Sequence, residues 1–93
     1  MKSYLVIEIY KAGKTEEIYE RFSKKGRMLP QGVEYVNSWI EEDLKKCYQI
    51  MKSESEEKLI EWIEKWKDLV DFEIIPVIDS QEAAQRAKGD EVK

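Results

Sequence analysis

The sequence contains no histidine and only one cysteine among its 93 residues. Without histidine, the chain lacks the commonest general base, the usual haem ligand and most zinc sites. A single cysteine excludes an internal disulfide and favours a reducing compartment. A glycine-rich phosphate loop, a CxxC pair and a serine nucleophile elbow are also missing. We therefore expect neither a cofactor nor a metal ion.

Long hydrophobic runs are missing as well, and no segment approaches the ~20 apolar residues of a transmembrane helix. The apolar run from Tyr4 to Ile7 is interrupted by Glu8 and has no small-residue cleavage site after it, which is unlike a secretory signal. We therefore expect a cytoplasmic protein without a membrane partner. The net charge of −4 argues against nucleic acid, because phosphate-backbone recognition needs a basic surface.

What the chain does contain is a balance of 42% hydrophobic and 39% charged residues, which is typical of a soluble folded protein. Its length fits one domain over residues 1–93, with the charged end 89–93 expected to fray. A core of this size is thin, so association with a second copy would help it.

Residue patterns predict four strands and three helices. β-Branched and aromatic runs indicate strands over 4–10, 33–41, 46–52 and 72–78. Helices are expected from Thr15 as N-cap to a stop at Gly26, from a Ser53–Glu56 capping box to about Lys67, and over 81–88. The order βαββαβ plus a short C-terminal helix predicts an α+β, ferredoxin-like fold. Its four-stranded antiparallel sheet has the order 4-1-3-2, which puts Pro76 on an edge strand as its missing N–H requires.

The sheet is apolar on both faces, although two helices can cover only one. Alternation along the first strand predicts that Leu5, Ile7 and Ile9 point toward the helices. The uncovered face then holds Tyr4, Val6, Glu8, Tyr10, Tyr35, Asn37, Trp39, Cys47, Gln49, Met51, Glu73, Ile75 and Val77. Burying about eight large side chains gains roughly 12–24 kcal/mol, against ~4–15 kcal/mol for association. We therefore expect a homodimer with its sheets face to face.

Several motifs resemble a small bacterial family of domains of unknown function. They are Gly26-Arg27-Met28-Leu29-Pro30 with Gly32, Asn37-Ser38-Trp39, Cys47-Tyr48-Gln49-Ile50-Met51, and the run from Asp68 to Val77. That family is similar to the dimeric α+β barrel superfamily, so the resemblance implies that architecture. The superfamily includes cofactor-independent monooxygenases and isomerases. Several of its members use a histidine that this chain lacks, so their catalytic residues do not carry over.

Polar residues that interrupt the uncovered face suggest a pocket for a small organic ligand. Glu8 and Glu73 are expected on that face, where paired carboxylates could act as acid and base, or else simply form ion pairs. Arg27 could clamp a ligand carboxylate or phosphate, or else only pin its loop. The candidate pocket residues are Glu8, Tyr10, Arg27, Tyr35, Asn37, Trp39, Gln49 and Glu73.

Three further residues are given structural roles. Cys47 has no histidine to activate it and is expected to be a small buried side chain. Trp62 and Trp66, four residues apart on a helix, are expected in the core. No residue is assigned a catalytic role.

Three functions remain open. The first hypothesis is a homodimeric barrel that binds a small organic ligand between its two sheets. A second hypothesis is a histidine-free enzyme, similar to a monooxygenase or isomerase, with Glu8 or Glu73 as base. The third is a structural or protein-interaction module.

Overall fold

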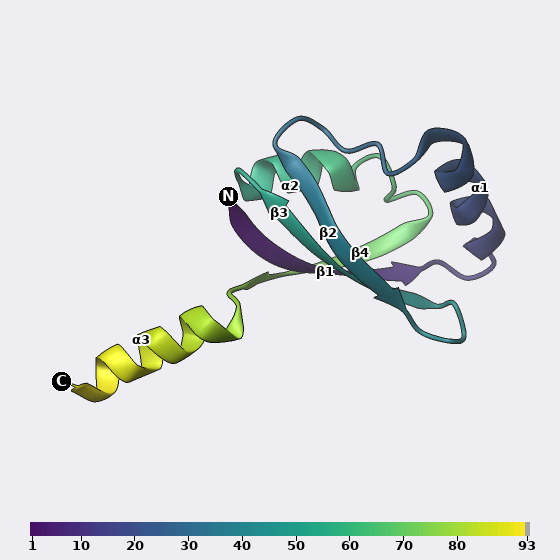
Figure 1. Ribbon diagram of the computed structural model, residues 1–93. Coiled ribbons are helices and arrows are strands. Elements are labelled where there is room, and N and C mark those ends of the chain that lie inside the picture. The colour runs from purple at the N-terminus through teal and green to yellow at the C-terminus, as the bar shows by residue number, and fades with distance from the viewer. Residues whose placement is uncertain (93) are drawn as a thin grey trace.

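The computed structural model describes residues 1–92 (Figure 1). Its elements are β1 (Lys2–Tyr10), α1 (Thr15–Lys25), β2 (Val33–Ile40), β3 (Lys46–Ser53), α2 (Glu56–Ile63), β4 (Val70–Val77) and α3 (Ser80–Val92). The strands form one antiparallel sheet in the order β2-β3-β1-β4. This is the predicted ferredoxin-like arrangement, and β4 with Pro76 lies at an edge as expected.

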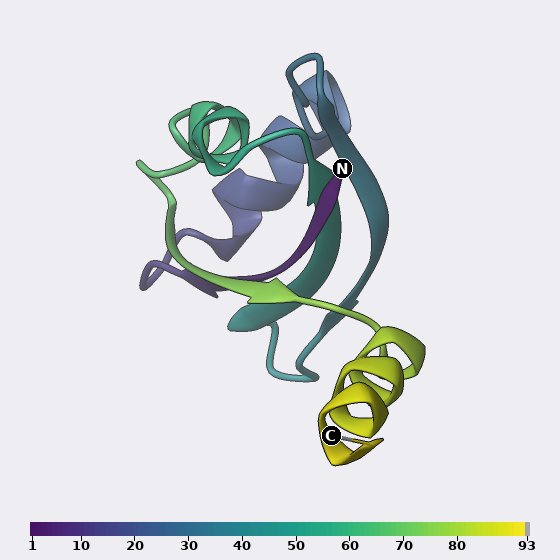
Figure 2. The same cartoon turned by 90° about the vertical axis from the view of Figure 1, so that its left-hand side faces the viewer.

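The helices are distributed unevenly around the sheet. α1 and α2 lie together on its concave face, whereas α3 leads away from the sheet (Figures 1 and 2). α3 extends to Val92, past the predicted end at Lys88, and residue 93 lies outside the described residues. Within residues 1–92, no helix therefore lies on the opposite face of the sheet.

Two predicted helix caps were wrong by one or two residues. Lys14, rather than Thr15, occupies the N-cap of α1, and the hydroxyl of Thr15 instead points to the carbonyl of Leu44. Ser55, rather than Ser53, caps α2, because its side chain accepts the N–H of Lys58 at 3.2 Å. The predicted stop of α1 at Gly26 is confirmed, with a φ of 66° there.

α2 is shorter than the predicted helix to Lys67. It ends at Ile63, and the N–H groups of Lys65 and Trp66 then bond to carbonyls three residues back. These tight turns still keep Trp62 and Trp66 on the side that faces the sheet. Both tryptophans are buried, which confirms their predicted place in the core.

The assignment of sheet faces was wrong for β1 and β3. Val6 is fully buried beneath the helices, while its neighbours Leu5 and Ile7 are only half-buried. Glu8 pairs in register with Phe72, and Ile7 pairs with Glu73. Since directly paired residues share a face, Glu8 and Glu73 lie on opposite faces. Both faces of β1 are apolar, so hydrophobicity alone did not reveal which one the crossover helices cover.

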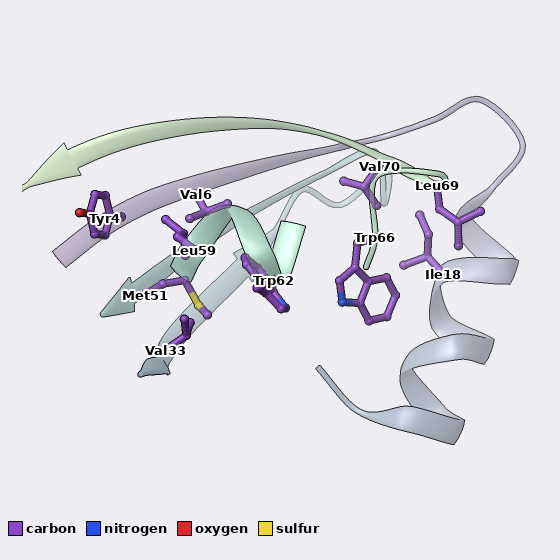
Figure 3. Packing of buried hydrophobic residues seen from close by; sticks show 10 residues of the cluster. All are labelled: Tyr4, Val6, Ile18, Val33, Met51, Leu59, Trp62, Trp66, Leu69 and Val70. Atoms are coloured by element: carbon purple, nitrogen blue, oxygen red, sulfur yellow. The ribbon is translucent and has the colours of Figure 1, made fainter. Parts of the chain in front are cut away.

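The core fills the space between α2, the segment after it, and the sheet (Figure 3). Trp62 sits on the underside of α2 and meets Phe72 of β4 edge to face, with ring centroids 5.8 Å apart. Met28 and Leu29 of the loop before β2 pack against this cluster. The cluster consists of Tyr4, Val6, Ile18, Val33, Met51, Leu59, Trp62, Trp66, Leu69 and Val70.

We call the face without helices the open face. It is strongly apolar, and its apolar side chains are half-buried or exposed: Leu5, Ile7, Ile9, Trp39, Tyr48, Ile50, Ile75 and Val77. A register shift in β2 between Tyr35 and Asn37 turns Tyr35 toward the helices and Asn37 toward the open face. Thus the predicted surplus of apolar sheet exists, with Trp39, Ile75 and Val77 on the open face as expected, but on β1 and β3 it consists of the other set of residues.

Candidate functional site

A cavity of about 190 Å³ lies beneath α1, next to the C-terminal end of α2. Its floor comes from β1, β2 and β3, and its walls come from α1, the loop after α1, the end of α2 with the turns after it, and the start of β4. The lining is largely aromatic and aliphatic: Tyr10, Ile18, Tyr19, Phe22, Trp39, Ile40, Trp62, Trp66 and Val70, with Glu8, Arg27, Ser38, Cys47 and Gln49 as the other members. A concave apolar site with a few convergent polar groups is typical of small-molecule pockets.

Glu8 and Gln49 form a buried polar pair on the cavity floor. Gln49 pairs with Val6 in register and Glu8 with Cys47, so Glu8 and Gln49 are diagonal neighbours on the same face. The Gln49 side-chain N–H donates to Glu8 Oε2. Burial raises the pKa of Glu8 from 4.5 to about 7, although Gln49 and Arg27 act in the opposite direction. The Glu8 carboxyl can therefore accept or donate a proton near neutral pH.

Arg27 is placed at the cavity by its backbone as well as its side chain. The carbonyl of Arg27 accepts the indole N–H groups of Trp62 at 2.9 Å and Trp66 at 3.0 Å. The side-chain ammonium group of Lys65 donates a hydrogen bond to the carbonyl of the next residue, Met28, at 3.0 Å. Three donors from the α2 region thus fix the loop that carries Arg27, which reduces the ordering cost of binding a ligand there.

Two aromatic rings hold the Arg27 guanidinium. Its Cζ lies 3.5 Å from the ring centroid of Tyr35 and 5.1 Å from that of Phe22. Such cation–π contacts contribute about 0.5–2 kcal/mol each and keep the group flat against the rings. The hydroxyl of Tyr35 is in turn 2.8 Å from Ser38 Oγ. The guanidinium is therefore fixed in position while its N–H groups stay available.

Tyr10 and Cys47 border the same cavity and are poorly suited to ionise. Burial raises the pKa of the Cys47 thiol to about 12 and also raises the pKa of Tyr10. The Tyr10 ring meets Tyr19 of α1 edge to face at 6.3 Å. Both side chains act as neutral walls, and Cys47 is buried as predicted.

The structure brings together five of the eight predicted pocket residues at this cavity: Glu8, Tyr10, Arg27, Trp39 and Gln49. Tyr35 supports Arg27 from below. Trp39 is 65% exposed and pairs with Tyr48, so it also belongs to the open face. Asn37 and Glu73 lie on the open face, away from the cavity. This cavity lies between the helices and the sheet, and the ligand pocket expected between two sheets stays a prediction.

Sequence reasoning missed the α1 wall of the cavity, formed by Ile18, Tyr19 and Phe22. Their helical spacing was visible, but it is equally typical of core packing. The two tryptophans gave a usable signal. Buried indole N–H groups need acceptors, so Trp62 and Trp66 on one helical face indicate a carbonyl brought to them from elsewhere in the chain.

In the described part of the chain, no helix has the length and apolar character needed to cross a bilayer. The same residues contain no cluster of three or more side chains arranged to hold a metal ion. Glu8 and Glu73, which were expected on one face, lie on opposite faces of the sheet.

Fold and site together define a small α+β protein with an aromatic-lined cavity beneath its first helix. The chain belongs to the family described as Domain of unknown function (DUF3303), which it matches over residues 1–90. No curated protein and no solved structure matches the chain. The family description assigns no activity, so the function is inferred from the cavity.

Proposed function

We propose that this protein binds a small organic ligand in the cavity beneath α1. One observation carries the proposal: Glu8, Gln49 and Arg27 converge on an otherwise apolar, aromatic cavity of about 190 Å³. An apolar cavity of about 150 Å³ takes up benzene, so this cavity suits a molecule with one substituted ring. If this part of the core served only stability, apolar side chains would fill the cavity.

Amide chemical-shift mapping with three one-ring probes tests the proposal. Benzamide, benzoate and benzylamine share a ring and differ in charge, so binding does not depend on guessing the charge of the ligand. We expect at least one probe to shift the amides of Ile18, Gln49 and Val70, which line the cavity. Shifts confined to the open face, or none at millimolar concentration, would contradict the proposal.

A matched pair of variants on β3 sharpens this test. Cys47→Leu adds apolar volume inside the cavity, whereas Ile50→Leu changes the open face of the same strand. We expect the first variant to weaken probe binding by at least tenfold and the second to leave it unchanged. Equal effects of both variants would show that the probe binds elsewhere.

The pKa of Glu8 favours a second candidate, a histidine-free enzyme in which Glu8 is a general base. A carboxylate with a pKa of about 7 in an apolar cavity can remove a proton next to a carbonyl group. Deuterium incorporation into small enolisable ketones in D₂O tests this activity by NMR. Exchange should be catalysed by the wild type and lost in Glu8→Gln. Equal exchange rates in the two proteins would contradict the hypothesis that Glu8 is a general base.

We also propose that two copies pair through their open faces to form a dimeric α+β barrel. Eight apolar side chains on one face exceed what monomers usually expose. The face also has basic residues on β3, Lys46 and Lys52, and acidic residues on β4, Asp71 and Glu73. Charges of both signs around an apolar centre support a self-complementary, two-fold pairing of the two copies.

The lone buried thiol of Cys47 supports a reducing compartment such as the cytoplasm.

Sedimentation equilibrium tests the pairing. The wild type should be a dimer at micromolar concentration, and Ile7→Glu, at the centre of the open face, should be a monomer. Ile60→Glu is the control, because Ile60 is 44% exposed on α2 and lies outside the open face. A monomeric wild type would overturn the pairing. A dimer that binds none of the three probes would instead favour a structural or protein-interaction module.

A further inference from the structure

Arg27 differs from the other two arginines in its partners. Arg21 makes two hydrogen bonds to Asp68, at 2.8 and 2.6 Å, and Arg86 bonds to Glu82 at 2.6 Å. Among the described residues, the Arg27 guanidinium has neither an ion pair nor a hydrogen-bond acceptor, only the faces of Phe22 and Tyr35. A fixed cation with its N–H groups unused, at the wall of a cavity, is suited to bind an anion.

Glu8 lies on the same cavity as Arg27 without forming an ion pair with it. One carboxyl oxygen of Glu8 accepts the N–H of Gln49, and the Cys47 thiol, a weak donor, is the other polar side chain that interacts with this carboxyl group. The remaining ionisable groups around it are Tyr10 on β1, Tyr19 on α1 and Cys47 on β3, while α2 and β4 contribute Trp62 and Val70. Arg27 is therefore the only cation among the described residues that line this cavity.

Building on the proposed function, we propose that the ligand is a one-ring aromatic carboxylate that binds between Arg27 and the protonated carboxyl of Glu8. The guanidinium donates to the carboxylate of the ligand, and the O–H of Glu8 donates to it from the other side. When Glu8 is ionised in the free protein, binding takes up one proton from solvent, because two facing carboxylates cannot both stay charged. The aromatic lining accommodates the ring.

Two features of the structure support the uptake of a proton. Burial already holds the pKa of Glu8 at about 7, so protonation near neutral pH requires little further change. Gln49 donates an N–H to Glu8, an interaction that persists after protonation because the carbonyl oxygen still accepts it. The same arrangement disfavours a cationic ligand, which Arg27 would repel.

Isothermal titration calorimetry with benzoate, benzamide and benzylamine between pH 5.5 and 8.5 tests this inference. Benzoate affinity should be constant below the pKa of Glu8 and should fall about tenfold per pH unit above it. Benzamide affinity should not change with pH. At pH 8, benzoate titrations in buffers of different ionisation enthalpy should report the uptake of one proton.

Two variants separate the roles of the residues. Arg27→Gln should weaken benzoate by about tenfold or more and leave benzamide within threefold. Glu8→Gln keeps an N–H donor in place of the O–H, so it should bind benzoate and lose the pH dependence. Heteronuclear NMR spectra of both variants establish that they fold.

The outcomes distinguish this inference from the proposed function. Benzamide binding without benzoate binding, a pH-independent benzoate affinity, or the same pH dependence in Glu8→Gln would overturn the carboxylate assignment and leave the cavity site standing. A preference for benzylamine would do the same. If none of the three probes binds, the cavity site itself is overturned.

Discussion

The two ends of the helix-covered face use the same strands for different purposes. Under α2, Val6 and Met51 are fully buried against Leu59 and Trp62. Two residues further along β1 and β3, the same face carries Glu8 and Gln49 and borders a cavity. The end under α2 is densely packed, as a stable core requires. The end with Glu8 and Gln49 contains a cavity and polar side chains instead. We infer that stability comes mainly from the packed end and binding from the hollow end, as is common where function and stability compete.

The largest expected effect comes from opening the packed end. Leu59→Ala removes a side chain with 0% exposure, so the free energy of unfolding should fall by about 2–5 kcal/mol. Urea denaturation at one fixed protein concentration measures the change. Ile60→Ala, the next residue on α2 and largely exposed, should change it by less than about 0.5 kcal/mol. Similar losses in both variants would show that this end is not tightly packed.

The next effect concerns pH and the hollow end. The pKa of Glu8 is about 7 in the folded protein and 4.5 when unfolded, so only the unfolded state loses this proton between those values. The contribution of Glu8 to stability is therefore greatest below pH 4.5, falls by about 3 kcal/mol as pH rises to 7, and is constant above it. The difference in unfolding free energy between wild type and Glu8→Gln, measured from pH 4.5 to 8.5, isolates this contribution. A difference that does not change with pH would show that Glu8 is not buried as described.

Replacing the polar pair sharpens the comparison further. Gln49→Met removes the donor to Glu8 and should cost about 1–3 kcal/mol at pH 8. The double variant Glu8→Leu with Gln49→Met removes both partners and should restore or exceed the stability of the wild type. The double variant should no longer bind benzoate. If it were less stable than Gln49→Met alone, the pair would be stabilising the fold rather than serving the cavity.

The smallest expected effect concerns the ion pair that holds α1 over the cavity. Asp68→Asn weakens the paired hydrogen bonds from Arg21, which hold the pKa of Asp68 below its usual value. Asp68 is largely exposed, so the loss of stability should be at most about 1 kcal/mol. Hydrogen exchange of the α1 amides should increase more than exchange in α2. Equal increases in both helices would show that the ion pair does not specifically restrain α1.

Much of the fold could be predicted from local patterns. The strands, the stop of α1 at Gly26 and the edge position of Pro76 follow from backbone restrictions that act within a few residues. The buried tryptophans follow from helical spacing. The cap of α2 was misplaced because Ser53 and Ser55 offer the same chemistry, and only the backbone geometry selects one of them. The cap of α1 was misplaced because Lys14 makes no side-chain capping hydrogen bond, so no capping residue marks that position.

The sequence predicted several of the residues that form the site, but it did not predict which face of the sheet they lie on. Glu8, Arg27 and Gln49 stood out as polar residues in apolar surroundings, and the structure places all three on one cavity. Glu73 and Asn37 looked equivalent to them and lie on the other side of the sheet. The register shift in β2 and the pairing of β1 with β4 decided this, and neither follows from any single strand.

The amino-acid sequence by itself determined the order of elements, the ferredoxin-like sheet and an excess of apolar surface, because these depend on residue type and short-range periodicity. Only the tertiary structure decided which face of the sheet α1 and α2 cover. On β1 both faces are apolar, so the gain from burial is nearly the same either way. The choice falls to strand register and to the handedness of the crossovers, which connect residues far apart in the chain.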